Sequence, residues 1–268
     1  MWIRENWKII LPNWWEVKEL ADIVYCEWLK LKRSKILLIG FTGSFIVPFL
    51  VTVNDIRISF SNPDAPLSLG GIYEDTIMFI MLLFGPLIMA VVATYLISRE
   101  YTEKTLKTVF AVSVNRSLFL TGKFIILFIL VLLFMLLSWL DIIVITMVCS
   151  LFLDVAKITA LSAVFTLVQM LKGGILLYAT LTPFVYLALR AKGSIAPFIV
   201  IAAVSLLNVV LSGSPVAGVY PWTASYLLLT GNLSQSGVSS APGGLIILLV
   251  YASGICASII RFQKEDIT

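Results

Sequence analysis

The stretch FIILFILVLLFMLLSWLDIIVITMVCSLFL, residues 124–153, decides the class of this protein. It contains one charged side chain, Asp141, and its apolar residues follow one another without the alternation of a barrel strand. A helix over this stretch is about 45 Å long, whereas the hydrocarbon core of a bilayer is about 30 Å thick. We expect a membrane-spanning helix that tilts, bends or extends beyond the bilayer.

The composition of the whole chain agrees with this expectation. Of its 268 residues, 60% are hydrophobic and only 13% are charged, and the mean hydropathy is +1.02. Soluble domains carry about 25% charged residues, so a soluble enzyme fold is excluded. The chain has no histidine, which removes the commonest general base and the usual ligand of zinc and haem. We predict no catalytic, cofactor-binding or metal-binding residue.

Six apolar stretches are long enough to cross the hydrocarbon core when Gly, Pro and charged residues are taken as their boundaries. The sequence therefore predicts an all-α integral membrane protein with six transmembrane helices, in a domain covering residues 36–268. The predicted spans are residues 36–53, 76–97, 123–149, 173–190, 195–211 and 244–260.

The distribution of Lys and Arg predicts the orientation. With the N-terminus inside, the outer side carries only Arg57, Lys157 and Lys172 of the 19 basic residues. Because cytoplasmic loops are enriched in Lys and Arg, we expect a multi-pass membrane protein with both termini in the cytoplasm. A basic inner face is typical beside anionic membrane lipid, so the net charge of +4 does not indicate a nucleic-acid partner.

Residues 1–35 are predicted to form a cytoplasmic segment with an amphipathic helix over 16–33. Apolar residues recur there at steps of three and four, and charged residues share the other side. We expect this helix to lie in the headgroup plane, although a simple basic flank of the first span is the alternative. The residues that define the interfacial helix are Trp15, Glu27, Trp28, Lys30 and Arg33.

Two segments on the outer side are predicted to differ in structure. The segment 54–71, NDIRISFSNPDAPLSLGG, is rich in Pro and Gly and is expected to be a solvent loop without regular structure. The segment 212–243 is expected to form a half-buried re-entrant hairpin around the apolar stretch 221–231. Pro221 suits a first helical turn there and Gly231 suits a helix end.

A charged Asp141 at mid-membrane would raise the free energy of membrane insertion by about 2.5–3.5 kcal/mol. Its place beyond the middle of the span leaves a functional and a structural interpretation open. Its candidate partners are Lys157, Lys172 or a polar cavity.

The connection 98–123 is longer than two neighbouring spans require. Its first part is predicted to continue the second span as a charged helix, with Glu100 and Lys104 spaced for an i,i+4 pair. Leu106, Val109 and Phe110 then form a small apolar face. Such a face on the cytoplasmic side is expected to dock on a partner protein, and an ordinary long loop is the alternative.

The sequence of this connection, REYTEKTLKTVFAVSVNRSLFLTGKF, resembles the signature between spans two and three of ABC-2 type transporter permeases. It departs from the family pattern at Lys104 and Ser113, where Gly and Pro are usual. In the N-terminal segment, Glu27, Lys30 and Arg33 resemble an element of the bacitracin and lantibiotic immunity subgroup. The matching positions of the connection are Glu100, Thr105, Leu106, Arg116, Gly122 and Lys123.

The resemblance implies a permease of the bacterial cytoplasmic membrane with the fold of type V exporters. It implies that the chain is not an enzyme, and the sequence contains no phosphate-binding GxxxxGK[ST] loop. ATP and Mg²⁺ would be bound by a separate ABC ATPase subunit, present in two copies, and the permease would pair with a second copy or a paralogue. The expected cargo is an amphiphilic peptide antibiotic. The resemblance assigns coupling to the ATPase to Glu100, Thr105, Leu106, Val109, Phe110 and Arg116.

Two other functions stay open from the sequence. One is export of a lipid-linked polysaccharide or another lipid by the same kind of permease. The other is a membrane scaffold or sensor that binds a peptide without moving it. An intramembrane enzyme is disfavoured, because the chain lacks a GxSxG elbow, histidine and a second mid-membrane Asp beside Asp141.

Overall fold

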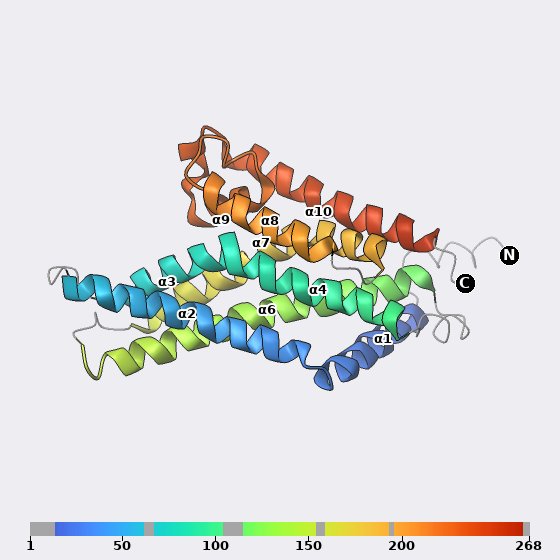
Figure 1. The fold of residues 1–268 in the computed structure, drawn as a ribbon, viewed down its shortest axis with the longest axis horizontal. Helices are drawn as coiled ribbons and strands as arrows, with labels where there is room; N and C mark the ends of the chain where they lie inside the picture. The colour runs from blue at the N-terminus through green and yellow to red at the C-terminus, as the bar shows by residue number, and fades with distance from the viewer. Residues whose placement is uncertain (1–13, 62–66, 104–114, 154–158, 193–195, 265–268) are drawn as a thin grey trace, which may run out of the picture.

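The computed structural model describes residues 14–61, 67–103, 115–153, 159–192 and 196–264, and within these ranges the chain is mostly helical (Figure 1). The elements in chain order are α1 (Trp14–Lys32), α2 (Ile36–Ser61), α3 (Leu69–Phe79), the π-helical η2 (Ile80–Phe84), α4 (Gly85–Thr102), α6 (Arg116–Cys149), α7 (Ala160–Ala191), α8 (Ala196–Leu211), α9 (Pro221–Thr230), the 3-10 helical η3 (Asn232–Ser236) and α10 (Ser240–Gln263).

Five helical units are long and apolar enough to cross a membrane: α2, the continuous unit Leu69–Thr102, α6, α7 and α10. The sixth apolar helix, α8, has 16 residues and is about 24 Å long. These six units coincide with the six predicted spans, so the predicted all-α membrane fold is confirmed.

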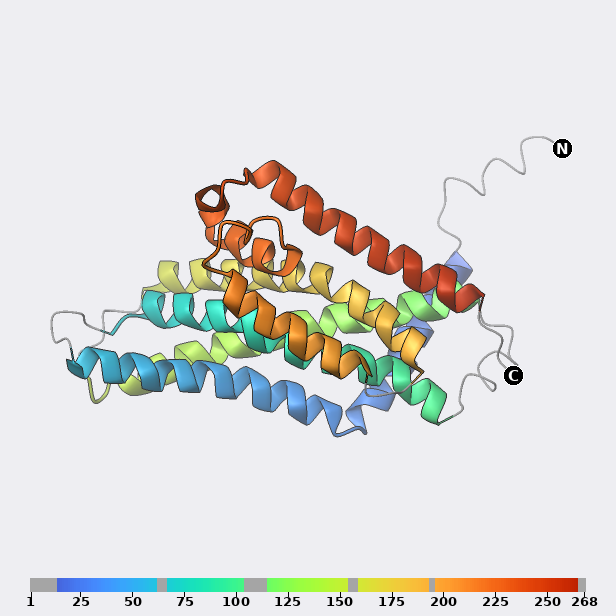
Figure 2. The ribbon, with the colours of Figure 1, turned by 45° about the horizontal axis from the view of Figure 1, so that its top comes forward.

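Successive spans run in opposite directions (Figures 1 and 2). As a result, α1, the end of α4, the start of α6 and the end of α10 lie at one end of the molecule, which we call the α1 end. The short helix α9 lies at the opposite end, the α9 end. Within the bundle α7 packs against α4, α6, α9 and α10, and its side chains Leu181 and Phe184 are buried in the core.

Several predicted boundaries differ from the structure. The segment expected to be an outer solvent loop is partly helical, since α2 continues to Ser61 and α3 begins at Leu69. The extension of α2 is held by Ile56, which packs against the main core. The fourth span begins at Ala160 rather than 173, because Thr159 and Ser162 form a capping box and start the helix earlier.

The third span is longer than its apolar stretch. Helix α6 has 34 residues, about 51 Å, and begins at Arg116, before the apolar stretch. Towards the α9 end, the indole N–H of Trp139 donates to the Ala163 carbonyl at 3.2 Å and to Thr166 Oγ1 at 3.1 Å. These bonds tie α6 to the early turns of α7 that the sequence did not predict.

The second span is interrupted by the π-helical turn η2, which Pro86 explains. Proline has no backbone N–H, so Pro86 leaves the carbonyl of Leu82 without its i→i−4 donor. Asn208 of α8, which is fully buried, donates from Nδ2 to that carbonyl at 3.0 Å. The amide of Gly85 instead donates to Ile80 with the i→i+5 spacing of a π-helix. A side chain from another span thus supplies the donor that Pro86 cannot give to the Leu82 carbonyl.

The helix predicted within the outer hairpin is present. It begins at Pro221 and ends at Thr230, and Gly231 follows with φ +75°, a left-handed conformation that glycine adopts without strain. The indole of Trp222 donates to the Thr180 carbonyl of α7 at 3.1 Å. The depth of α9 in the bilayer stays a prediction.

Candidate functional site

The α1 end contains four interacting charged side chains, which we call the charge cluster. Its members are Glu27 and Lys30 of α1, Glu100 of α4 and Lys123 of α6. The side chains of both glutamates and of Lys123 are at most 4% exposed, and that of Lys30 is 31% exposed. The cluster therefore lies inside the protein and joins three helices.

Lys123 is the centre of the charge cluster. Its Nζ donates to Glu27 Oε2 at 2.9 Å, to Glu100 Oε1 at 3.0 Å and to the Leu96 carbonyl at 3.0 Å. These three bonds use all three hydrogens of the ammonium group. The same nitrogen lies 4.9 Å from the centre of the Phe119 ring, within cation–π range.

Lys30 completes the pairing from the solvent side. Its Nζ lies 2.8 Å from Glu27 Oε1 and 3.0 Å from Glu100 Oε1. Burial opposes a charge on Lys30, but hydrogen bonding and attraction to these two carboxylates outweigh burial and raise the pKa of Lys30 above 10.5. Two lysines thus balance two glutamates, and the cluster is neutral as a whole.

Close packing of α1 on α6 brings the charge cluster together. Gly122, beside Lys123, has no side chain, and a Cβ there would lie 2.6 Å from Cγ2 of Ile23 on α1. A larger residue at position 122 would push α1 away from α6. One turn beyond Glu27, Leu31 is buried in the core and fixes the end of α1.

Arg99 fastens the end of α4 to the end of α1. It donates from Nη1 to the Lys30 carbonyl at 3.1 Å, and this carbonyl belongs to the last turn of α1, which has no helical donor. Its Nε lies 2.8 Å from Oε1 of Glu103. The last turn of α4 is therefore held in place where the connection to α6 begins.

The start of α6 is joined to the end of α10. Asn115 caps α6 by accepting a hydrogen bond from the amide of Ser117. Arg116 donates to the Gln263 carbonyl at 3.2 Å, and Gln263 Nε2 lies 2.8 Å from Ser117 Oγ. Both ends of the connection between α4 and α6 thus rest on other helices.

The residues predicted to couple to an ATPase divide into two groups. Glu100 lies in the charge cluster, and Arg116 lies against the end of α10. Their predicted coupling role stays a prediction. The other predicted coupling residues, together with Lys104, fall outside the described residues: Thr105, Leu106, Val109 and Phe110.

The predicted amphipathic helix is present as α1, and its place in the headgroup plane stays a prediction. Lys30 was expected on a face turned to the headgroups, whereas it turns inward to the two buried carboxylates. Arg33 is exposed as expected, and Trp28 is partly buried against the core. The side chain of Trp15 lies outside the described residues.

The sequence did not reveal that Lys123 binds Glu27 and Glu100. A signal was present, since a lysine at the start of an apolar span and a glutamate just after the preceding span have opposite charges near one membrane depth. Charged groups at such positions pair with one another.

Asp141 is partly buried in α6. Of its candidate partners, Lys157 lies outside the described residues. Lys172 is exposed, and no ion pair joins it to Asp141 within the part of the chain that the structure describes. A role for Asp141 stays a prediction.

Comparisons with known proteins agree with the motif between spans two and three. Residues 23–210 match the family described as "ABC-2 family transporter protein". This range contains the whole charge cluster and the helices from the second half of α1 to α8. A curated relative, the bacitracin transport permease protein BCRB of Bacillus licheniformis, is 26% identical over 208 residues, which cover 76% of this chain and 96% of that protein.

Proposed function

The chain belongs to the ABC-2 family of transporter proteins, in the bacitracin-like group of permeases, and on this basis we propose that it is the membrane subunit of an ATP-driven exporter. A permease of this kind is not itself an enzyme. We assign ATP and Mg²⁺ binding to a separate ABC ATPase subunit in two copies. A second permease, either an identical chain or a paralogue, completes the membrane part.

The observation that carries this proposal is the charge cluster beside the connection from α4 to α6. Because Lys123 binds carboxylates of α1 and α4 at once, a displacement of that connection moves three helices together. Packed elements with two discrete arrangements transmit small movements over long distances. In the proposed mechanism, closure of the ATPase subunits pulls on the segment 104–114, and the cluster carries this movement into spans two and three.

The proposed orientation places the α1 end in the cytoplasm. Lys32 and Arg190 lie in the last turns of α1 and α7, and Lys264 caps the end of α10, so all three belong to helix ends at the α1 end. Arg57 lies near the end of α2, at the opposite end of that helix from α1. Since Lys and Arg are enriched on the cytoplasmic side, this distribution supports cytoplasmic termini and access of the ATPase to the connection.

The proposed cargo is a membrane-active peptide such as bacitracin, exported for resistance or self-protection. The name of the Bacillus licheniformis relative supports this cargo. Export of a lipid-linked polysaccharide or other lipid, and a scaffold that senses peptide without moving it, are the competing functions.

ATP turnover in a reconstituted complex tests the proposal. The chain is purified with the ABC ATPase that accompanies it, placed in nanodiscs and titrated with bacitracin. We expect bacitracin to stimulate ATP turnover, and Glu100→Gln and Arg116→Ala to lower this stimulation at least about tenfold, the factor for 1.4 kcal/mol of lost coupling. Arg57→Gln, at the α9 end, is the control and should retain the stimulation.

The outcomes separate the competing functions. Failure to purify with an ATPase would contradict the exporter assignment. An ATPase complex that responds to a lipid-linked oligosaccharide and not to bacitracin would replace the peptide cargo by the lipid cargo. Peptide binding with no change in ATP turnover would favour the sensor. Full stimulation in the Glu100→Gln variant would remove the charge cluster from the coupling mechanism.

A further inference from the structure

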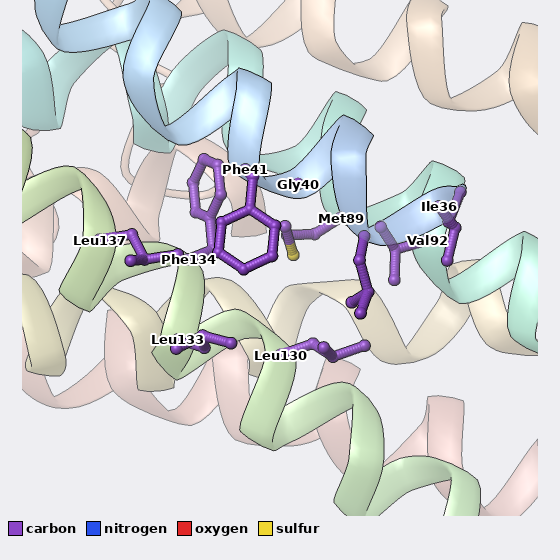
Figure 3. Close-up of a pocket in the computed structure, with 10 residues that line it drawn as sticks. Ile36, Gly40, Phe41, Met89, Val92, Leu130, Leu133, Phe134 and Leu137 are labelled. Atoms are coloured by element: carbon purple, nitrogen blue, oxygen red, sulfur yellow. The ribbon is translucent and has the colours of Figure 1, made fainter. Parts of the chain in front are cut away.

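A groove opens on the surface of the bundle between α2, α4 and α6 (Figure 3). It is partly open to the surface and runs from Ile36 at the start of α2 to Leu137 of α6. Along α6 its wall extends from Leu130 to Leu137, about 10 Å. All ten lining residues are apolar, so the groove suits a hydrocarbon chain and offers nothing to a polar ligand.

Gly40 keeps this groove open. It lines the groove, and a Cβ built at this position has no atom within 4 Å. Gly43, one turn further along α2, differs, because its Cβ would overlap the side chain of Ile88 on α4. The two glycines therefore have separate roles: Gly43 lets α2 approach α4, and Gly40 leaves space that nothing in the described chain fills.

Three cations lie close in sequence to Ile36, the residue at one end of the groove. Lys32, Arg33 and Lys35 are exposed, and among the described residues none of them pairs with a carboxylate. The turn that carries them is ordered by a bond from the Ser34 amide to the Leu31 carbonyl at 2.8 Å. Lys30, two residues before Lys32, is occupied by the charge cluster.

We propose that the groove is a binding site for an anionic phospholipid of the bilayer. One acyl chain lies along Gly40 between α2 and α6, and the phosphate lies beside Lys35 and its two neighbouring cations. The apolar groove matches the acyl chain of such a lipid, and the three exposed cations beside it in the sequence match its phosphate. The site does not depend on the exporter function, since lipid surrounds the protein in any state.

The charge at the groove also argues against a second copy of the chain as its occupant. A twofold contact through α2 would bring the same three cations of both copies together, and like charges at a contact oppose association. An anionic lipid headgroup instead neutralises them.

Photolabelling with lipids in nanodiscs tests this site on the full chain. The probes are phosphatidylglycerol and phosphatidylcholine, each with a diazirine in one acyl chain and each present in the same unlabelled lipid mixture. Labelled peptides are mapped by mass spectrometry. We expect phosphatidylglycerol to label residues 36–41 and 130–137 at least about fivefold more than phosphatidylcholine, because a single Lys or Arg near an anionic surface gives roughly a fivefold preference.

Two variants remove the two halves of the site separately. Lys35→Gln should lower the preference for phosphatidylglycerol by roughly fivefold and leave labelling by phosphatidylcholine unchanged. Gly40→Leu should lower labelling of 36–41 and 130–137 by both lipids, since the new side chain occupies the groove. Arg57→Gln removes an exposed cation from the other end of α2 and should change neither result.

If phosphatidylglycerol and phosphatidylcholine label residues 36–41 and 130–137 of the unaltered chain equally, the proposal is overturned. An unchanged preference for phosphatidylglycerol in Lys35→Gln would overturn it as well. Absence of lipid labelling together with disulfide-linked dimers of Phe41→Cys would show that a second copy fills the groove, and would overturn it equally.

Discussion

The Nζ of Lys123 lies 2.9 Å from Oε2 of Glu27, which is 96 residues earlier in the chain. This pair joins α1, which precedes the first span, to the start of the third span. Since Glu100 of the second span binds the same lysine, α1, α4 and α6 meet at one nitrogen atom. Removal of the Lys123 ammonium group therefore affects all three helices at once.

Lys123→Met should strongly destabilise the fold. It leaves two buried carboxylates with Lys30 as their shared cation, and removal of one partner of a buried ion pair typically costs about 3–5 kcal/mol. The free energy of unfolding is measured by titration with sodium dodecyl sulfate in mixed micelles. Lys18→Met removes an exposed lysine of α1 and should change stability by less than about 0.5 kcal/mol.

A double variant sharpens this prediction. Glu27→Gln should lower the free energy of unfolding less in the Lys123→Met background than in the unaltered chain. Without Lys123 the Glu27 carboxylate is poorly compensated, so removing its charge relieves part of the loss. Strict additivity of the two losses would show that the Glu27–Lys123 pair contributes no coupling energy.

The stability of the charge cluster should fall at high pH. The pKa of Lys30 is raised above 10.5 by Glu27 and Glu100, so its charged form is favoured in the folded state. The resulting stabilisation is complete below pH 10.5 and is lost as the pH rises through the folded-state pKa. Melting temperatures measured from about pH 8 to about pH 12 should therefore decline less in Lys30→Gln than in the unaltered chain, and parallel declines would contradict the prediction.

Asn208→Leu should weaken span two at η2. The substitution leaves the buried carbonyl of Leu82 without a donor, at a cost of about 1–3 kcal/mol. Hydrogen exchange of residues 80–84 and the free energy of unfolding are the measurements. In the Pro86→Ala background the same substitution should cost less, because alanine at this position supplies a backbone N–H to the Leu82 carbonyl. An equal cost in both backgrounds would refute this account of η2.

Gly254→Val should separate α10 from α7. A Cβ at Gly254 would lie 2.8 Å from the backbone nitrogen of Pro183 and would overlap Thr182, and backbone atoms cannot move aside cheaply. We expect a loss of about 1–3 kcal/mol in unfolding free energy, the range for overpacking. Gly244→Val, on the same helix, faces open space and should leave stability nearly unchanged.

Hydropathy and turn chemistry predicted the elements that depend on local sequence. The six apolar units were found because a run of about 17 or more predominantly apolar residues specifies a span wherever the chain places it. The helix Pro221–Thr230 was found because both of its ends are determined by backbone conformation at single residues, Pro221 at its start and Gly231 after its end. The early start of α7 was missed because Lys172 was taken as a boundary, whereas an exposed lysine within a long helix does not end it.

The charge cluster and η2 could not be predicted in this way, because each depends on contacts between distant segments. The periodicity of α1 places Glu27 and Lys30 on a polar side, but it does not show whether that side meets headgroups or a glutamate of α4. Pro86 predicts an unpaired carbonyl at Leu82, and only packing selects Asn208 as its donor.

The bond between Asn208 and Leu82 also bears on how the nascent chain is inserted. The two residues are 126 positions apart. At about 5–20 residues per second, the ribosome makes Asn208 roughly 6–25 s after Leu82. During this interval span two enters the lipid with an incomplete hydrogen-bond ladder, which hydrocarbon penalises. The early part of the polypeptide thus reaches its final form only when a much later part has been synthesised.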